Sequence, residues 1–306
     1  MGAGGALEGG RHADVRPEGA SSSVPAASAA SAVSGGGAPA NGPPEPAARA
    51  DAGTAPAPLR VVAYNFLAGG SRHRTGHWSR LVRDLGADLL LTQECRPPEE
   101  SSGERFRPSA GDHLLWSRAG TSRWGSGVLA RSARLAPISI AGYEGWIVGG
   151  TLESARWTHP RPLRVFSLHC PAGERGYVRT LHEILDRLAP LAAGADLILG
   201  GDFNVATGYR AATEKRTISR REKGILDRLA EEMDLVSCWQ AANPGRPLAQ
   251  TLRWSANRAT PYHCDGIFVS RSWLPRLASS RVVRGRRWER MSDHNPVTAH
   301  FSMPGP

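Results

Sequence analysis

Apolar residues from position 59 onward follow two patterns, short unbroken runs and one-sided stripes. Unbroken runs rich in Val, Ile and Leu are typical of strands buried on both faces. We expect such strands over 59–64, 88–94, 113–116, 126–130, 146–152, 163–169, 196–200, 264–269 and 297–301. Apolar residues spaced three and four apart predict amphipathic helices over 77–85, 175–192 and 225–233.

The order of these elements indicates the architecture. Strands and helices are mixed without strict alternation, and several strands follow one another directly, as hairpins do. A doubly wound sheet requires a helix between successive strands, so we do not expect one. We expect a four-layer α/β sandwich, with two packed mixed β-sheets flanked by helices. No internal repeat is visible in the sequence.

The first 56 residues differ from the rest of the chain. They are mostly Ala, Gly, Pro and Ser, and their few aliphatic residues follow no strand or helix period. Such a segment cannot bury enough apolar surface to offset the entropy of ordering it. We therefore expect a disordered tail over 1–56 and one folded domain over 57–306.

Localisation signals are also missing from the sequence. The N-terminus lacks the basic start and apolar run of a secretory signal, and Ala6 stands where N-myristoylation requires Ser or Thr. No apolar stretch is long enough for a transmembrane segment. We expect a cytoplasmic monomer.

The charge of the chain is strongly positive, with a formal net charge of +10 at pH 7. The tail carries three Arg against five Asp or Glu, so the remainder carries +12. This favours a polyanionic partner such as nucleic acid or an anionic membrane surface, although an Arg-rich surface can also serve solubility alone.

Candidate contact residues are Arg118, Arg123 and Trp124, and the run Arg281, Arg284, Arg286, Arg287 and Arg290. The alternative for this run is a solvated strand and loop. Trp78, Trp239 and Trp273 are expected in the core instead.

The four cysteines are too few and too scattered for a disulfide framework, and no Cys-x-x-Cys pair suggests structural zinc. Cys95, Cys170 and Cys264 each adjoin a polar residue discussed below. Because neighbours on a strand point to opposite faces, we expect these thiols to lie unreactive in the core, as we do for Cys238.

Polar side chains stand at the ends of the predicted strands. They are Asn65, Glu94, His169, Asp202, Asn204, Asp265, Asp293 and His294. Each alone fits a turn or helix cap, but strand ends of a central core meet, and that is where sites form. Gathering several carboxylates is costly unless a cation neutralises them, and oxygen ligands favour Mg²⁺, Mn²⁺ or Ca²⁺ over zinc.

These residues lie in six short blocks that are spread along nearly the whole chain after the tail. The blocks are Val-Val-Ala-Tyr-Asn65, Leu-Thr-Gln-Glu94, Phe-Ser-Leu-His169, Leu-Gly-Gly-Asp202-Phe-Asn204, Cys-Asp265-Gly-Ile-Phe-Val-Ser and Met-Ser-Asp293-His294-Asn-Pro-Val. In residue type and order the chain resembles the endonuclease/exonuclease/phosphatase superfamily, which has a deoxyribonuclease I-like fold. That superfamily includes deoxyribonuclease I, exonuclease III-type apurinic endonucleases, inositol polyphosphate 5-phosphatases and neutral sphingomyelinases.

The resemblance implies hydrolysis of phosphate esters with Mg²⁺, or with Mn²⁺ or Ca²⁺, by a catalytic domain over 57–306. Glu94 would be the main metal ligand, with Asn65 beside it and Asp293 helping to bind or position the metal. Asp202 would orient or deprotonate the attacking water, and Asn204 would donate a hydrogen bond to the phosphate. A metal and cationic donors stabilise charge on phosphate oxygens while a carboxylate prepares the nucleophile.

The two histidines would complete this site. His294, held by Asp265, would meet the scissile phosphate, because a carboxylate fixes the tautomer of an imidazole and favours its charged form. His169 would contact the phosphate or assist the leaving oxygen. Gly266 stands where relatives often have Tyr and is expected to open the pocket floor, while His263 is either a substrate contact or a structural histidine.

Several substrates remain compatible with this resemblance. Exonuclease III-type apurinic endonucleases typically have Tyr at the position of His169, which disfavours apurinic-site repair. Neutral sphingomyelinases usually need export or a membrane anchor. We expect a phosphodiesterase, an endonuclease acting on DNA or RNA. The alternatives are a phosphatase or phosphodiesterase of small or lipid-linked phosphates such as inositol phosphates, or a non-catalytic nucleic-acid-binding relative, against which the intact residue set argues.

Overall fold

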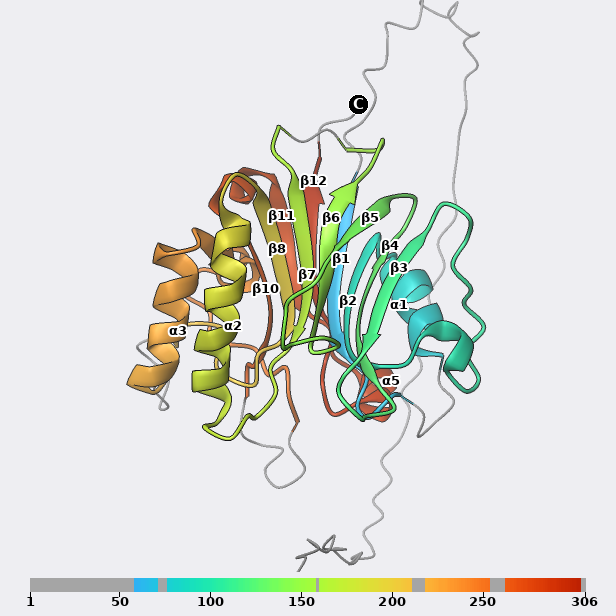
Figure 1. The fold of residues 1–306 in the computed structure, drawn as a ribbon, viewed down its shortest axis with the longest axis horizontal. Helices are drawn as coiled ribbons and strands as arrows, with labels where there is room; N and C mark the ends of the chain where they lie inside the picture. Colours follow the sequence, from blue (N-terminus) through green and yellow to red (C-terminus); the bar gives the residue numbers. More distant parts are fainter. Residues whose placement is uncertain (1–57, 71–75, 158–159, 211–217, 254–261, 304–306) are drawn as a thin grey trace, which may run out of the picture. The chain divides into compact units, whose positions relative to one another are not determined.

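The computed structural model describes residues 58–70, 76–157, 160–210, 218–253 and 262–303. The predicted disordered tail over 1–56 lies outside the described residues. All elements below belong to the unit that follows this tail (Figure 1).

The first sheet has six strands in the order β11-β12-β1-β2-β4-β3. Their bounds are Leu277–Val282 (β11), Val297–Ser302 (β12), Pro58–Asn65 (β1), Leu89–Cys95 (β2), Gly125–Ala130 (β4) and His113–Arg118 (β3). β1 and β2 are parallel, and helix α1 (His77–Leu85) lies between them in the chain. The remaining neighbours pair antiparallel.

The second sheet has six strands in the order β5-β6-β7-β8-β10-β9. Their bounds are Arg134–Ile138 (β5), Ile147–Glu153 (β6), Leu163–His169 (β7), Asp196–Asp202 (β8), Asp265–Ser270 (β10) and Leu235–Ser237 (β9). β7 and β8 are parallel with α2 (Tyr177–Ala192) between them, and the other neighbours are antiparallel. Each sheet therefore places one parallel pair among antiparallel strands, a repeat in topology that the sequence does not display.

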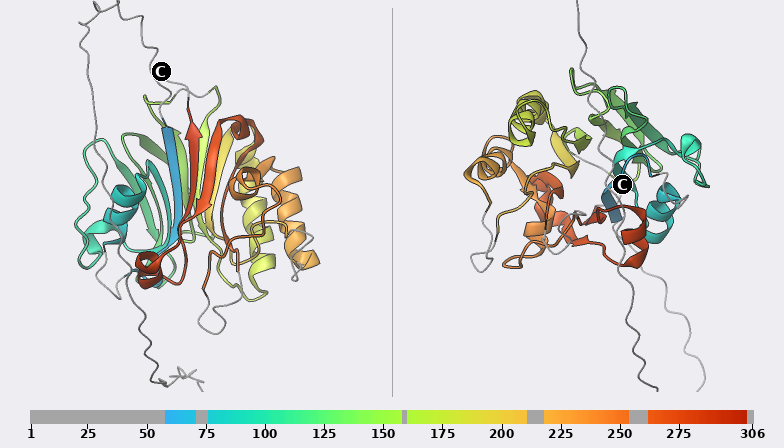
Figure 2. Two further views of the ribbon diagram at one scale, coloured as in Figure 1. Left: turned by 180° about the vertical axis from the view of Figure 1, so that it is seen from behind. Right: turned by 90° about the horizontal axis from the view of Figure 1, so that it is seen from below.

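The two sheets pack face to face, with helices on both outer sides (Figure 1). Between the sheets lies one apolar cluster, which includes Val61, Leu91 and Val165. α1 and α5 (Arg286–Met291) cover the first sheet, and α2 and α3 (Arg220–Glu231) cover the second. The view from behind in Figure 2 shows the same order of layers. The predicted four-layer α/β sandwich is confirmed.

Polar groups and glycines occupy the place where the sheets meet beside β8. Gln93 Nε2 donates to Ser167 Oγ (2.8 Å) across the two sheets, and Ser167 Oγ donates to the carbonyl of Thr92 (2.9 Å). Gly201 has a φ of +143°, and a Cβ there would lie 2.0 Å from the carbonyl oxygen of Leu168 and 2.8 Å from Gln93 Nε2. Only glycine fits this position.

Every strand and helix expected from the apolar pattern is present, with ends shifted by a few residues. α3 starts at Arg220 rather than 225, because Ser219 and Glu222 form a reciprocal capping box that brings a polar first turn into the helix. The expected core positions of Trp78, Trp239 and Trp273 are confirmed.

Short elements escaped the sequence analysis. They are β5, β9, β11, α4 (Cys238–Ala242), α5 and the 3₁₀ segments Pro98–Glu100 and Arg271–Arg276. Each has too few apolar positions to define a period. The Arg run, for which a strand and loop was one alternative, has Arg281 in β11, Arg284 in the following loop and its other members in α5. Trp288 and Met291 of α5 pack against the sheet.

Candidate active site

Four polar side chains come from the carboxyl ends of the two parallel strand pairs. Asn65 ends β1, Glu94 lies one residue before the end of β2, His169 ends β7 and Asp202 ends β8. Asn65 Nδ2 donates to Glu94 Oε1 and to Asp202 Oδ2, both at 3.1 Å. His169 Nε2 lies 3.7 Å from Glu94 Oε1. The residues that the sequence placed at separate strand ends therefore meet at one point between the sheets.

Glu94 is directed into this point by an irregular backbone. The pairing of β2 with β4 shifts register between Thr92 and Cys95, and Glu94 has a φ of +46°. Such a bulge changes the direction of a side chain at the end of a strand. A residue other than glycine in the left-handed backbone region is strained, so surrounding contacts must stabilise it there. The holding contact is a hydrogen bond from Ala68 N to Glu94 Oε2 (2.6 Å).

Asp202 is the central buried carboxylate. Its Oδ1 accepts from Asn204 N (3.0 Å), while Oδ2 accepts from Asn65 and lies 3.7 Å from His294 Nε2 and 3.9 Å from His169 Nε2. Burial raises the pKa of this carboxyl, against the opposing effect of the neighbouring His294. Asp202 thus has a higher proton affinity than an exposed carboxylate.

His294 is held by Asp265, as the resemblance implied. Its Nδ1 lies 2.9 Å from Asp265 Oδ2 and 3.0 Å from Oδ1, so Nε2 is turned toward Asp202 and also lies 3.8 Å from Asp293 Oδ1. Burial alone would lower the pKa of His294, but the carboxylates of Asp265 and Asp202 outweigh it and raise that pKa to about 10. The imidazole is therefore a cation at neutral pH.

Asp265→Asn is expected to lower the pKa of His294 in the metal-free protein from its native value of about 10, because burial is then opposed only by the carboxylates of Asp202 and Asp293. Since the folded pKa lies above the unfolded one, the native pair stabilises the fold fully below pH 6.5, and this stabilisation is lost as pH rises through about 10. Side-chain NMR titration of His294 in EDTA measures this directly. A wild-type midpoint near 6.5 would contradict the assignment.

A cleft of about 560 Å³ opens onto these groups. Its lining comprises Glu94, Trp124, Trp146, His169, Cys170, Pro171, Ala172, Tyr177, Asp202, Asn204, Leu252, Tyr262, Cys264, Asp293 and His294. Six of the eight residues singled out in the sequence thus face the cleft, while Asn65 and Asp265 lie behind its wall and orient others. Asn204 has a φ of +55° and donates through Nδ2 to the carbonyl of Cys170 (3.0 Å).

Aromatic residues form one side of the cleft. The rings of Trp124 and Trp146 lie 5.4 and 5.3 Å from that of His169, and Tyr177 is 40% exposed. Trp124 was predicted as a contact residue from the sequence, whereas Trp146 and Tyr177 were not. No sequence signal distinguishes them, because Trp146 reads as the start of a strand and Tyr177 as the start of a helix.

Two expectations about neighbouring residues need correction, and one open alternative is decided. Gly266 does not line the cleft, because Thr207 packs where a side chain would extend, with its Cβ 3.0 Å from a Cβ built on Gly266. Of the two alternatives for His263, the structural one holds, since its ring is buried against Trp239 and Nδ1 contacts the carbonyl of Ala249.

The second correction concerns the cysteines. All four are buried and free, and burial raises the pKa of Cys95 and of Cys170 to about 12. Cys170 and Cys264 nevertheless line the cleft beside their polar neighbours. Both lie just outside a strand, Cys170 after β7 and Cys264 before β10, so alternation between opposite faces does not apply to them.

The donor groups of the cleft fit a hard divalent cation. Glu94, Asp202 and Asp293 contribute carboxylates to the lining of the cleft, and the side chains of Glu94 and Asp293 remain 19% and 35% exposed. The buried Asp202 carboxyl carries a raised pKa, which a nearby cation would relieve. Oxygen-rich sets of this kind suit Mg²⁺, Mn²⁺ or Ca²⁺.

Comparison with known families settles the relationship that these residues indicate. The model of the endonuclease/exonuclease/phosphatase family matches residues 62–294. The chain belongs to this family. Hydrolysis of phosphoric esters is the activity that membership of this family supports. No curated protein matches the sequence. Among the described residues of this family member, no helix is long and apolar enough to cross a membrane.

Solved structures with the same fold include DNA-processing enzymes. The 3′ phosphatase NExo from Neisseria, bound to a product DNA hairpin, is similar with a TM-score of 0.57 and 20% identity, covering 79% of this chain and 99% of its own. The AP endonuclease LMAP from Leishmania major is similar with a TM-score of 0.59 and 15% identity, covering 81% of this chain and 88% of its own. An AP endonuclease from Archaeoglobus fulgidus is similar with a TM-score of 0.58 and 16% identity, covering 80% of this chain and 100% of its own. At these identities the likeness establishes the fold.

Proposed function

We propose that this family member is a divalent-metal-dependent phosphodiesterase that cleaves nucleic acid. One observation carries the proposal: the buried Asp202 carboxylate faces the ring nitrogens of both His169 (3.9 Å) and His294 (3.7 Å) at the wall of an open cleft. A base between two groups able to donate to phosphate oxygens is the arrangement that attack of water on phosphorus requires.

Each residue then has a distinct task. Asp202 accepts a proton from the attacking water, and its raised pKa makes it a stronger base than an exposed carboxylate. His294, cationic through Asp265, donates from Nε2 to a non-bridging phosphate oxygen, and Asn204 donates beside it. His169 turns Nε2 toward the same space and serves the phosphate or the leaving oxygen.

Glu94 would hold the metal together with Asp293, and Asn65 fixes Glu94 from behind. A divalent cation at these residues supplies positive charge to the phosphate oxygens. The side-chain oxygen of Asn65 is already engaged, because it accepts a hydrogen bond from Leu67 N (2.9 Å). Asn65 therefore positions the carboxylates of Glu94 and Asp202 by donating to them through Nδ2.

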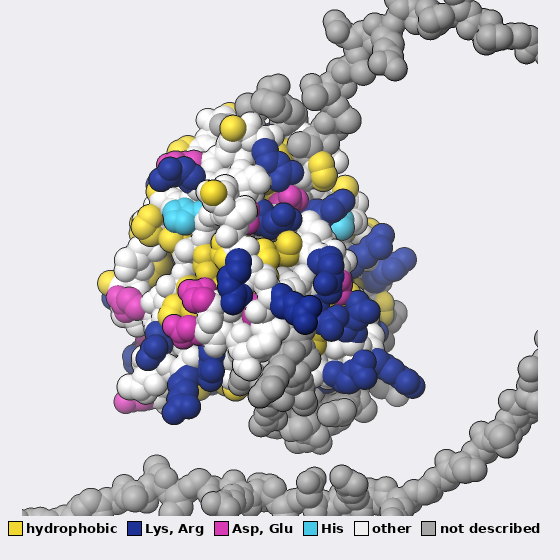
Figure 3. All heavy atoms as spheres, turned by 90° about the vertical axis from the view of Figure 1, so that its right-hand side faces the viewer, with side chains coloured by type: hydrophobic (Ala, Val, Ile, Leu, Met, Phe, Trp, Pro, Cys, Tyr) yellow, Lys and Arg dark blue, Asp and Glu magenta, His cyan; other side chains and the backbone are white. Residues whose placement is uncertain are grey.

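Nucleic acid is the favoured substrate because aromatic and cationic groups adjoin the cleft. Trp124 lines it, and two exposed arginines lie in the same hairpin, Arg118 at the end of β3 and Arg123 in the turn before β4. Tryptophan faces can stack on bases, and guanidinium groups pair with backbone phosphates. Figure 3 shows basic side chains spread over the face that carries α1. The DNA-processing relatives with this fold point in the same direction.

Purified protein is expected to nick supercoiled plasmid or cleave single-stranded DNA or RNA in Mg²⁺, and EDTA is expected to abolish cleavage. Readdition of Mg²⁺ or Mn²⁺ should restore it, because the carboxylates at the cleft need a cation to bind a phosphate anion. Gel analysis of products with inositol phosphates as parallel substrates measures this.

Each outcome of this panel decides something. Phosphate release from inositol phosphates with intact nucleic acids would replace the proposal by the small-substrate alternative. Binding of nucleic acid without turnover in any divalent metal would indicate a non-catalytic relative. Cleavage that persists in EDTA would contradict the metal dependence.

A further inference from the structure

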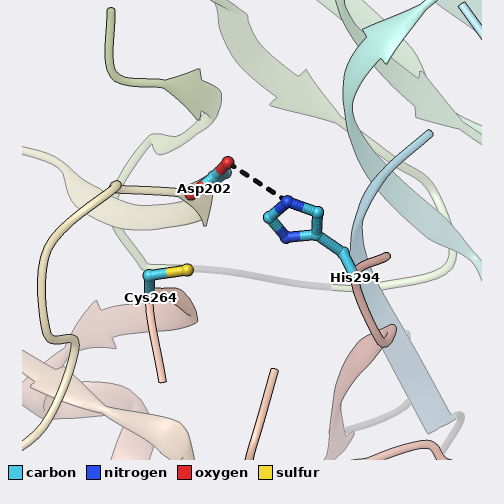
Figure 4. A group of neighbouring side chains, drawn as sticks. All are labelled: Asp202, Cys264 and His294. Atoms are coloured by element: carbon cyan, nitrogen blue, oxygen red, sulfur yellow. Dashed lines mark ion pairs between the residues drawn. The ribbon is translucent and has the colours of Figure 1, made fainter. Parts of the chain in front are cut away.

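A thiol lies within the catalytic constellation. Cys264 lines the cleft, and its sulfur, a carboxylate oxygen of Asp202 and a ring nitrogen of His294 all lie within 4.8 Å of one another. Figure 4 shows the Asp202 carboxylate and the His294 ring facing each other, with the thiol directed toward the space between them. The proposed reaction uses Asp202 and His294 but assigns nothing to the sulfur.

The three ligand atoms suit a softer metal than Mg²⁺. Sulfur, imidazole nitrogen and carboxylate oxygen are the donors that bind Zn²⁺, at about 2.3, 2.0 and 2.1 Å in tetrahedral sites. In such a tetrahedron the ligand atoms lie roughly 3.3–3.8 Å apart. His294 Nε2 and Asp202 Oδ2 lie 3.7 Å apart, and the sulfur lies within 4.8 Å of a ligand atom of each residue, so small adjustments bring all three to these spacings.

The surroundings pre-orient two of these ligands. Asp265 holds Nδ1 of His294 at 2.9 Å, which leaves Nε2 as the free ligand nitrogen, and a carboxylate behind a metal-binding histidine is a common arrangement at zinc sites. The backbone N–H of Cys264 is fixed by Thr251 Oγ1 (3.0 Å), so the thiol is presented by a positioned backbone. The cleft leaves the fourth coordination position to water.

We propose that Asp202, Cys264 and His294 form an inhibitory site for Zn²⁺ and related thiophilic divalent ions. Binding forms a metal–sulfur bond, and the protons on the thiol and on Nε2 pass to solvent. Because this site takes two groups that the reaction needs, its occupation blocks turnover even when Mg²⁺ is in excess. The inhibition rests on the proposed function, but the metal binding does not.

The full chain is tested with Co²⁺ as a spectroscopic probe and Zn²⁺ in competition. Wild type is expected to bind one Co²⁺ with a thiolate charge-transfer band in the near ultraviolet, displaced by Zn²⁺. Cys264→Ser should lose the band and at least about 100-fold in Zn²⁺ affinity, since loss of an outer-sphere partner alone costs 10–100-fold. Cys170→Ser is the matched control, because this thiol lines the same cleft outside the ligand set.

The outcomes separate the two proposals. A band that persists in Cys264→Ser, or that is lost in Cys170→Ser instead, would overturn the zinc site. If wild type is active, Zn²⁺ should inhibit it at concentrations well below that of Mg²⁺. Inhibition of Cys264→Ser should require about 100-fold more Zn²⁺, because this variant has lost a ligand. A Cys264-dependent band in a protein that hydrolyses no phosphate ester would sustain the zinc site and refute the phosphodiesterase.

Discussion

Asp202→Asn is expected to lower kcat by about 10²–10⁴-fold, the contribution of a positioned general base. The amide keeps the shape of the side chain and can still contact Asn65, but it cannot take a proton from water. Burial raises the pKa of the native carboxyl, so removing its charge should leave the unfolding free energy of the metal-free protein unchanged or slightly higher. Steady-state kinetics on the best substrate of the panel, with thermal unfolding in parallel, measure both effects.

Asp186→Asn on α2 is the matched control for this change. Its side chain is 64% exposed and pairs with Arg228 at 2.7 Å, so the same chemical substitution should alter neither rate nor fold appreciably. If Asp202→Asn kept a rate within a few fold of wild type, Asp202 would not be the base. If it unfolded the protein, the carboxylate would have a structural role that its contacts do not indicate.

Gly201→Ala is expected to destabilise the fold by at least about 3 kcal/mol, in the range of severe core disruption. The added Cβ would meet the Leu168 carbonyl at 2.0 Å and the Gln93 amide at 2.8 Å, both parts of the core that cannot move aside cheaply. A φ of +143° adds backbone strain for any residue but glycine. Denaturant unfolding gives the difference directly.

Gly224→Ala provides the comparison on the same chain. This glycine lies inside α3, with nothing within 4 Å of its Cβ position, so alanine should stabilise the helix by about 0.5–1 kcal/mol. An unfolding free energy for Gly201→Ala within about 1 kcal/mol of wild type would mean that the sheets adjust at this point more easily than well-packed interiors allow.

Much of the fold follows from the apolar pattern alone. β7 and α1 begin and end where that pattern predicts, because strands buried on both faces and helices with one buried stripe leave direct signatures. The helix α3 could also have been extended to Arg220 from the sequence, since Ser219 and Glu222 have the spacing of a capping box. Short pieces such as β9 carry no such signature.

The site was predictable in its members but not in its contacts. Strand ends and motif order identify Asp202 and His294, yet only the structure reveals that Asn65 stands behind the cleft and bridges two carboxylates. Trp146 was missed as a cleft residue, because its position depends on how two sheets face each other. Cys264 was misplaced for a local reason, since it precedes the strand on which alternation was assumed.

The shared topology of the two sheets has a mechanical consequence for the reaction. Asn65 and Glu94 belong to one sheet, whereas His169 and Asp202 belong to the other, so the groups of the proposed site lie on either side of the junction between the sheets. A sliding of the sheets by a fraction of an ångström would change the distance from Glu94 to His169, now 3.7 Å, without altering either sheet internally. The contacts of Ser167 across the two sheets therefore set the spacing of the proposed site, and conservative changes at Ser167 are expected to alter the rate before they unfold the protein.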